Sequence, residues 1–275
     1  MEINVLDKGF VRLVDSMGDD SRIVQSARVS YADGTKSIRK DKGLIDFLTR
    51  HKHTSPLEQV EFTFHIKLPL FVMAQLVRHR TASLNQMSAR YSVMKDEFYI
   101  PSRVRSQDNQ NKQGSLFGGV DEENELIKLF EDNAERAYQD YEQLLDSGVA
   151  REMARMVLPQ NLYTEVYWNQ DLHNLLHLIK LRMDSHAQWE IQQYAEAIYQ
   201  IVKEITPWAI ESWEEHSLNS VSLGRLEQRV LREMGEYSEE KLDSLLADFV
   251  ENKVVSKGRS REIKSNIKNI FTKND

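Results

Sequence analysis

An alternating segment between residues 60 and 66 constrains the fold of this chain more than any other feature. Its apolar positions are Val60, Phe62, Phe64 and Ile66, and polar side chains stand between them. This period of two is expected of a β-strand with one face on a hydrophobic core. Pro69 lacks the N–H group that a strand inside a sheet donates, and its fixed φ suits the first turn of a helix. We therefore expect a sheet with one covered face, followed by a helix over residues 70–79.

Helical spacing dominates the rest of the sequence. Apolar residues recur at intervals of three and four, which predicts helices at residues 21–28, 37–51, 122–145, 150–157, 172–183 and 189–216. Pro207 predicts a kink in the last of them. Two short strands joined by a turn open the chain, and a further strand is expected at residues 162–168. The polar stretch 102–119 is typical of a mobile loop. These elements predict an α+β fold, with a central, mostly antiparallel sheet and flanking helices.

The pattern changes in the last part of the chain. Short amphipathic segments separated by glycines follow there, so we expect a main domain at residues 1–216 and a mainly helical extension at residues 217–275. From Lys253 to the end, seven basic residues stand against two acidic ones, whereas the whole chain has a net charge of −7. The net charge argues against nucleic acid as a partner, and a basic end on an acidic body is usually a solvated tail.

Several classes of chemistry are excluded by composition. The chain has no cysteine, which rules out disulfides, thiolate metal sites and thiol nucleophiles. The most apolar run, residues 68–77, is interrupted by Pro69 and Gln75 and is about half the roughly 20 residues that a membrane-spanning helix needs. The first residues show no basic stretch before an apolar core. We therefore expect no membrane association, no secretory signal and a cytoplasmic location.

A polar and cationic cluster begins at the end of the helix expected at residues 70–79. Arg78, His79 and Arg80 stand there, and a stretch too polar for a core follows with Ser83, Asn85, Gln86, Ser88, Arg90 and Tyr91. Guanidinium groups donate in a fork that suits phosphate, and Ser, Asn and Gln can bind the edges of a base or sugar. The cluster indicates an anion or nucleotide site. The alternative is a solvated helix end whose arginines pair with surface acids.

The order Arg78-His79-Arg80, seven residues and then Ser88 is the signature of flavin-dependent thymidylate synthases, and the chain resembles that family. Further segments are similar to the family in the order it uses, at residues 7–20, 51–72, 97–102, 154–168 and 181–195. The resemblance covers residues 1–216 and implies the fold of that family. It leaves out the extension at residues 217–275 and the polar stretch after Ser102.

The resemblance implies the reductive methylation of dUMP to dTMP. Methylenetetrahydrofolate would donate the carbon, FAD would carry the hydride, NADPH would be the usual reductant and tetrahydrofolate would be the folate product. The lack of cysteine agrees with this chemistry, because the unrelated thymidylate synthase attacks the uracil ring with a cysteine, whereas a flavin can deliver hydride instead. The family also implies a homotetramer with active sites shared between subunits.

The resemblance also implies the residues that contact dUMP. They are Gln75, Arg78, Gln86, Ser88, Ala89, Arg90, Arg155 and Arg182. Arg182 is the expected catalytic activator, because its fixed charge can stabilise negative charge on the pyrimidine. The alternative for Arg182 is a helix-surface pair with Asp184 or Glu190. Ser88 is expected to bind the nucleotide. A covalent role would need an adjacent base, and none of its close sequence neighbours is a His, Asp or Glu.

The residues implied for FAD form a second set. They are Ser55, Glu58, Arg78, His79, Arg80, Asn85, Gln86, Asp171, His173 and His177. His53 is expected to act near the flavin ring and the folate pocket. Ser55 and Gln86 stand where related chains often have Thr and Glu, and the hydroxyl and carbonyl groups persist. His173 and His177 share one helix face, but no third ligand with zinc-like spacing is evident, so we expect no metal.

Two other classes of function are open on the sequence. A nucleotide- or RNA-binding module without catalysis would use Arg78, Arg80, Arg90 and the basic tail. It would be colourless, and its binding would fall steeply with salt. A structural protein that kept the fold and lost catalysis is the third hypothesis. The presence of both signature arginines, Ser88 and Arg182 argues against it.

Overall fold

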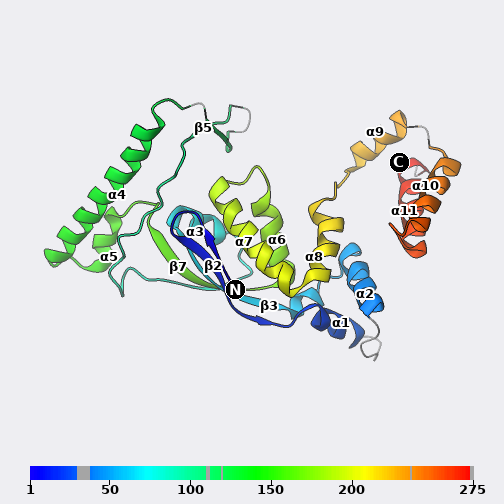
Figure 1. The fold of residues 1–275 in the computed structure, drawn as a ribbon, viewed down its shortest axis with the longest axis horizontal. Coiled ribbons are helices and arrows are strands. Elements are labelled where there is room, and N and C mark those ends of the chain that lie inside the picture. Colours follow the sequence, from blue (N-terminus) through cyan, green and yellow to red (C-terminus); the bar gives the residue numbers. More distant parts are fainter. Residues whose placement is uncertain (30–37, 110–111, 119, 236, 273–275) are drawn as a thin grey trace. The chain divides into compact units, whose positions relative to one another are not determined.

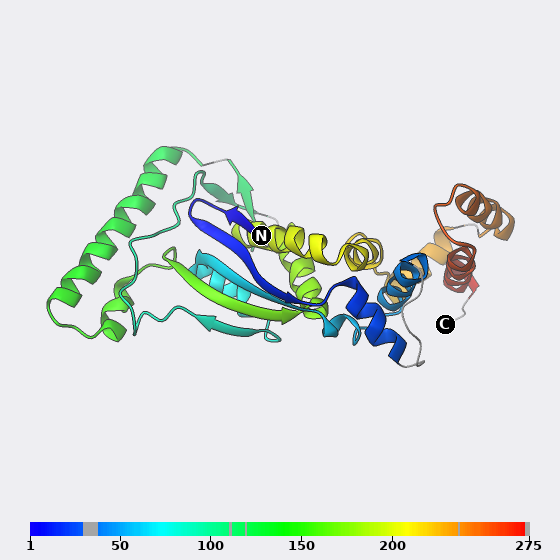
Figure 2. The ribbon, with the colours of Figure 1, turned by 60° about the horizontal axis from the view of Figure 1, so that its bottom comes forward.

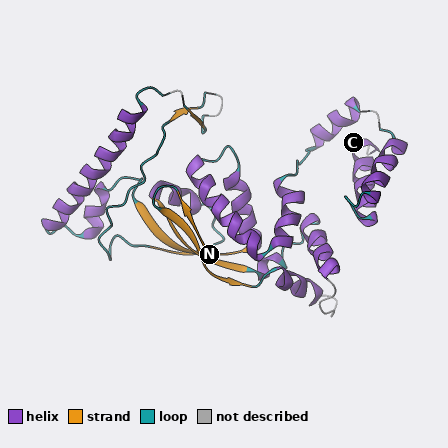
Figure 3. Cartoon of the chain, in the orientation of Figure 1, coloured by secondary structure: helices purple, strands orange, loops and turns teal. Residues whose placement is uncertain are grey.

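The computed structural model describes residues 1–29, 38–109, 112–118, 120–235 and 237–272. The chain divides into two compact units, Met1–Asn219 and Ser220–Asp275. The first unit contains the strands, and the second is helical (Figures 1 and 3). The domain boundary expected after residue 216 stays a prediction, because compactness alone does not show that a segment folds independently.

A five-stranded antiparallel sheet forms the centre of the first unit. Its strands, in spatial order, are β1 (Glu2–Val5), β2 (Gly9–Met17), β3 (Glu61–Pro69), β7 (Tyr163–Asp171) and β4 (Ser83–Gln86). Every neighbouring pair is antiparallel. The opening hairpin, the strand after Val60 and the α+β class are confirmed. The sequence analysis missed β4, whose four residues show no alternation and which forms as an edge strand against β7.

The sheet is covered on one face (Figure 2). Phe62, Phe64, Ile66 and Leu68 of β3 are fully buried in a core shared with α3 (Leu70–Leu76), α6 (Leu172–Met183) and α7 (Trp189–Ile205). The side chains between them are half-buried on the other face. The alternation of the sequence thus has the structural cause expected of it.

Pro69 ends β3 and is the N-cap of α3, so the helix begins one residue later than a first-turn proline would place it. The helix is also shorter than expected. It ends at Leu76 rather than His79, and the N–H groups of Arg78 and His79 bond to carbonyls three residues back, at 3.3 and 3.0 Å. The tighter turn carries Arg78 and His79 out of the helix.

The end of the first unit is a broken helix rather than one kinked helix. The expected helix at residues 189–216 is divided into α7, α8 (Pro207–Trp213) and a π-helical turn at Glu214–Leu218. The buried carboxylate of Asp20, at the start of α1 (Asp20–Arg28), accepts hydrogen bonds from the N–H groups of Trp208 and Ala209, at 2.8 and 3.0 Å. It therefore caps α8. α2 (Ile38–Arg50) packs against α8, and its expected start at residue 37 lies outside the described residues.

A second, smaller core lies under α4 (Glu123–Asp146). α5 (Arg151–Ala154) and a 3₁₀ turn at Arg155–Val157 follow it, and a further 3₁₀ turn at Leu57–Gln59 precedes β3. The stretch 102–119, expected as a loop, instead forms a hairpin of β5 (Arg105–Gln107) and β6 (Ser115–Phe117). Residues 110, 111 and 119 of that stretch lie outside the described residues.

The second unit consists of α9 (Arg225–Met234), α10 (Glu239–Glu251) and α11 (Lys257–Thr272). Lys264 of α11 pairs with Glu239 and Asp243 of α10, at 2.9 and 2.6 Å. The expectation of a mainly helical extension is confirmed for its described residues, whereas residues 273–275 of the basic tail lie outside them. None of the helices in the described ranges has the length and apolar character needed to cross a bilayer.

Candidate active site

Arg182 is the centre of a hydrogen-bonded group at the end of α6. Its Nε donates to Nε2 of His79 at 2.9 Å, and a terminal nitrogen donates to the backbone carbonyl of Gln75 at 3.2 Å. The helix-surface alternative is not what the structure shows, because Asp184 bonds to His186 and Glu190 bonds to Arg105. Arg182 is half-buried, and desolvation lowers its pKa from the ordinary value. Its remaining N–H groups are available to a ligand.

His79 is held in its neutral form. Its side chain is buried, and burial, the Arg182 charge and His177 lower its pKa to about 4. A neutral imidazole can accept the Arg182 hydrogen bond at Nε2, which places its own proton on Nδ1. The His79 and His177 rings lie 6.2 Å apart. One line of contacts, which begins at the backbone carbonyl of Gln75, therefore links Gln75 and Arg182, predicted for dUMP, to His79 and His177, predicted for FAD.

Three predicted histidines meet at a cavity of about 270 Å³. His53 lines it from the segment after α2, and His173 and His177 line it from α6. Lys180 follows one turn later on the same face of α6 and also lines the cavity. The sequence analysis did not select Lys180, although its spacing from His173 and His177 could have found it. Lys180 donates to the carbonyl of Ser217 at 2.6 Å.

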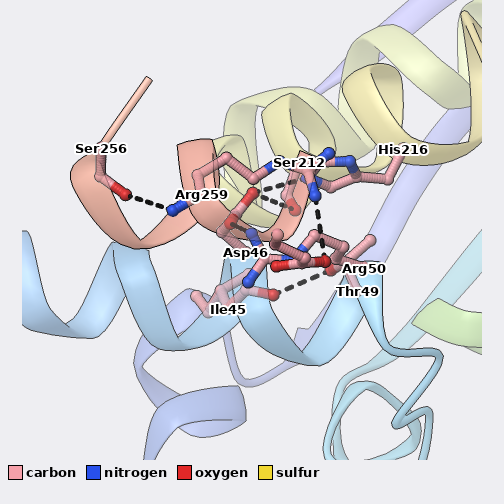
Figure 4. A network of polar contacts seen from close by, with 9 residues as sticks. Ile45, Asp46, Thr49, Arg50, Ser212, His216, Ser256 and Arg259 are labelled. Carbon is pink, nitrogen blue, oxygen red and sulfur yellow. Dashed lines mark hydrogen bonds and ion pairs between the residues drawn. The ribbon is translucent and has the colours of Figure 1, made fainter. Parts of the chain in front are cut away.

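Asp46 of α2 contacts residues that form another wall of this cavity (Figure 4). Its carboxylate lies 2.7 Å from His216 Nε2, accepts a hydrogen bond from Ser212 Oγ at 3.5 Å and pairs with Arg50 at 3.4 Å. Arg50 and His216 both line the cavity. Among the described residues, the cavity lining includes cations and imidazoles but no carboxylate. Asp46 offsets the charge of Arg50, so Lys52 and Lys180 are the lining cations that favour an anionic ligand.

The signature segment runs along the edge of the sheet. Asn85 stands opposite Tyr167, and Gln86 stands opposite Val166, so their side chains point to opposite faces of β4. Gln86 donates to Thr164 Oγ1 at 3.2 Å, and Asn85 is exposed. One flavin can therefore contact both residues only if the flavin, or a second subunit, lies at the free edge of β4.

Ser88, Ala89 and Arg90 follow β4. Ser88 Oγ accepts from the N–H group of Arg90 at 3.3 Å, and within the described chain no imidazole or carboxylate is bonded to it. Ser88 thus has no neighbouring base to remove its hydroxyl proton, which agrees with a binding role rather than a covalent one. Ala89 packs against the smaller core. Arg90 pairs with Glu152 at 3.1 Å, so the surface-pair alternative describes this arginine.

Three predicted arginines differ from Arg90. The side chains of Arg78, Arg80 and Arg155 are exposed, and in the part of the chain that the structure describes they have no ion pair or side-chain hydrogen bond. An unpaired guanidinium is free to bind a phosphate through its forked donors. The alternative of a solvated helix end paired to acids therefore does not hold for Arg78 and Arg80.

The other residues predicted for FAD lie near the ends of α2 and β7. Ser55 is exposed, and Glu58 accepts from Thr54 Oγ1 at 2.9 Å. Asp171 caps α6, because it accepts from the N–H group and the amide of Asn174 at 3.0 and 2.7 Å. Burial and the Asp171 charge both raise the pKa of Glu61 across the strand pair. A phosphate beside Asp171 would need cations nearby, and its flavin contact stays a prediction.

No group of three His, Asp or Glu side chains with a metal-binding arrangement occurs within the described residues. The structure does reveal polar residues that the sequence analysis did not select for the site. Glu190 is buried and bonded to Arg105 of the hairpin, and Gln188 joins Glu190 to Gln75. Gln188 and Glu190 lie in the same segment as Arg182, but no local pattern distinguishes them from surface residues.

The one-sided sheet, the unpaired arginines and the histidine-lined cavity define an α+β protein with a site suited to nucleotides. The sequence model of the family described as "Thymidylate synthase complementing protein" matches residues 12–208. A flavin-dependent thymidylate synthase of Thermus thermophilus is 58% identical over 232 residues, which cover 84% of this chain and 85% of the relative. One of Treponema denticola is 53% identical over 237 residues, covering 85% and 89%.

A solved structure agrees with these sequence relatives. The UMP/dUMP methylase PolB from Streptomyces cacaoi, bound with 5-Br dUMP, superposes with a TM-score of 0.70 at 33% identity. The alignment covers 78% of this chain and 97% of the methylase. The chain belongs to the family of flavin-dependent thymidylate synthases, so the resemblance found in the sequence is confirmed.

Proposed function

We propose that this chain catalyses the reductive methylation of dUMP. In the balanced reaction, dUMP, methylenetetrahydrofolate, NADPH and a proton give dTMP, tetrahydrofolate and NADP⁺. The observation that carries the proposal is the line of contacts from Gln75 through Arg182 and His79 to His177. It joins the residues predicted for the nucleotide to those predicted for the flavin. The names of the relatives, and the dUMP analogue in the PolB structure, support the same reaction.

The residues present fit a flavin dinucleotide in part. The unpaired Arg78 and Arg80 would hold its phosphates, and His53, His173 and His177 would line its ring or adenine end at the cavity. When bound, FAD would supply the hydride that the protein lacks the groups to supply. The cavity of about 270 Å³ is below the range of about 300–1,000 Å³ typical of sites that enclose small ligands. One chain therefore encloses only part of FAD.

The partial enclosure supports a shared site. Asn85 and Gln86 lie on opposite faces of the edge strand β4, and Arg155 lies on a separate turn. A second subunit at this edge would complete contacts that one chain leaves open. We propose a cytoplasmic homotetramer with active sites shared between subunits.

Arg182 has the geometry of an activator. Its contacts with His79 and Gln75 fix the guanidinium plane, and its half-buried position weakens the hydration of the charge. A fixed cation at the pyrimidine stabilises negative charge that develops on the ring during carbon transfer. The neutral His79 orients this cation without adding a second charge. Folate would approach from the side of His53.

The test combines a spectrum with product analysis. Purified protein should be yellow and should release FAD on denaturation. With dUMP, methylenetetrahydrofolate and NADPH, it should form dTMP together with tetrahydrofolate, separated by chromatography. Dihydrofolate in equal amount to dTMP would show that folate, not flavin, is the reductant. A colourless protein that cannot be reconstituted, with binding that falls steeply with salt, would favour the nucleotide- or RNA-binding module instead.

A further inference from the structure

A chain of hydrogen bonds runs from the buried Glu190 to Gln75. The Nε2 amide of Gln188 donates to Glu190 Oε2 at 2.9 Å, and Gln75 Nε2 donates to Gln188 Oε1 at 2.6 Å. Gln75 lies on α3, and Gln188 is the N-cap residue of α7. The backbone carbonyl of the same Gln75 accepts from Arg182 at 3.2 Å. The chain therefore ends at a residue in direct contact with the expected activator.

Glu190 is a rigid anchor for this chain. Its side chain is 3% exposed and pairs with one terminal nitrogen of Arg105, which contacts both carboxylate oxygens at 2.7 and 2.9 Å. The hydroxyl of Tyr99 donates to the same carboxylate at 3.1 Å. The Arg105 guanidinium also lies 5.7 Å from the Phe117 ring centre and 5.6 Å from that of Trp189. A buried carboxylate needs such a partner to stay charged, and the hairpin at residues 105–117 supplies it.

The charge of Glu190 sets the direction of every bond in the chain. An ionised carboxylate only accepts hydrogen bonds, so Gln188 must turn its nitrogen toward Glu190 and its oxygen toward Gln75. Gln75 must then turn its own nitrogen toward Gln188. Its Oε1 has no hydrogen-bond partner among the described residues, so it is left to accept from a ligand.

We propose that Gln188 is a positioning residue for the nucleotide. It holds the Gln75 amide so that Oε1 accepts a hydrogen bond from an N–H or O–H group of dUMP, and the Arg105–Glu190 pair keeps that orientation from reversing. The inference rests on the proposed function, in which Gln75 contacts dUMP. Gln188 is exposed and lines a cavity of about 720 Å³ together with Arg105 and Trp189. Gln75 itself is half-buried, and its bond to Gln188 is exposed, so a nucleotide has access to this end of the chain.

The experiment compares dUMP binding to flavin-loaded wild type and variants by titration calorimetry, with kcat and KM measured alongside. Gln188→Met keeps the side-chain size and removes both hydrogen bonds. Loss of one oriented hydrogen bond should weaken dUMP binding about three- to tenfold, with kcat at saturating dUMP and the KM for folate close to wild type. Gln188→Glu cannot donate to Glu190 but still accepts from Gln75 Nε2, so it should keep part of the Gln75 orientation and bind dUMP more tightly than Gln188→Met.

Gln192→Met is the matched control. Gln192 lies in α7, lines the same cavity and donates to the Ala187 carbonyl at 2.7 Å, outside the chain to Gln75. Its dUMP affinity should match wild type. Arg105→Ala should weaken dUMP binding in the same direction as Gln188→Met, and Arg105→Lys should recover most of the loss, because it keeps a charge beside Glu190.

The outcomes separate this inference from the proposed function. Wild type that fails to bind dUMP refutes the proposed function. Wild type that binds dUMP while Gln188→Met and Gln188→Glu bind it equally well overturns the inference alone. Equal weakening by Gln192→Met, or a fall in kcat with an unchanged KM for dUMP, also overturns it, because either result shows a general effect on the loop or on the chemistry. If Gln188→Met loses its flavin, Arg105→Ala and Arg105→Lys decide the inference.

Discussion

Replacing His79 by glutamine should change how the stability of the protein depends on pH. Burial, the Arg182 charge and His177 lower the pKa of His79 from 6.5 to about 4 in the folded chain. As the pH falls below 6.5, the unfolded chain takes up a proton that the folded chain refuses until about pH 4. The folded state is therefore destabilised over that window, and the effect is complete near pH 4.

The magnitude follows from the two pKa values. At about 1.4 kcal/mol per pH unit, the interval from 6.5 to about 4 corresponds to about 3 kcal/mol of unfolding free energy. Glutamine removes this titration and keeps a carbonyl acceptor for Arg182 Nε. The free energy of unfolding of wild type, minus that of His79→Gln, should fall by about 3 kcal/mol between pH 7 and pH 4.

Urea unfolding of the flavin-free proteins, at one fixed protein concentration, measures this difference. His186→Gln is the control, because it makes the same substitution at an exposed imidazole that bonds to Asp184 rather than to Arg182. Its difference from wild type should stay within about 1 kcal/mol over the same range. The unfolding free energy of wild type minus that of His79→Gln is the deciding quantity. If it is independent of pH, or if it increases as the pH falls, His79 is not a buried neutral imidazole beside Arg182.

The remaining predictions concern activity, a helix cap and the C-terminal unit. Arg182→Ala should keep its flavin spectrum but lose dTMP formation by about 10²- to 10³-fold, and wild-type turnover would show that Arg182 is not the activator. Burial raises the pKa of Asp20 from 3.8 to about 6, so wild-type stability relative to Asp20→Asn should fall by about 2 kcal/mol as the pH rises from 4 to 8. A rising difference in urea unfolding would contradict this sign. A chain ending at Asn219 should stay soluble and bind FAD, since Met1–Asn219 is compact by itself. Insoluble or flavin-free protein would show that the helical unit completes the core or the oligomer.

Local periodicity was sufficient for the elements whose own residues build the core. β3 alternates because every second side chain is buried, and α6 spans the predicted residues because its apolar positions face the sheet. Each pattern is a direct record of which side of the element meets water. The family could also be recognised from the sequence, because its signature is a short run of residues in fixed order.

Elements that depend on a distant partner were not predictable in this way. Ser83–Gln86 is a strand because β7, about 80 residues later in the chain, offers it hydrogen bonds. The hairpin of β5 and β6 is polar throughout much of its length, and Arg105 attaches it to the buried Glu190. Backbone pairing and the buried Arg105–Glu190 ion pair stabilise these elements, and neither can be predicted from a pattern of apolar residues.

The site divides along the same line. The sequence by itself determined which chemical groups are available, namely arginines and histidines with no thiol. Only the tertiary structure decided the state of those groups. Arg90 is neutralised by Glu152 whereas Arg78 is not, and His79 is uncharged because it is buried beside Arg182. Pairing and desolvation depend on distances between segments remote in sequence, and such distances exist only once the chain has folded.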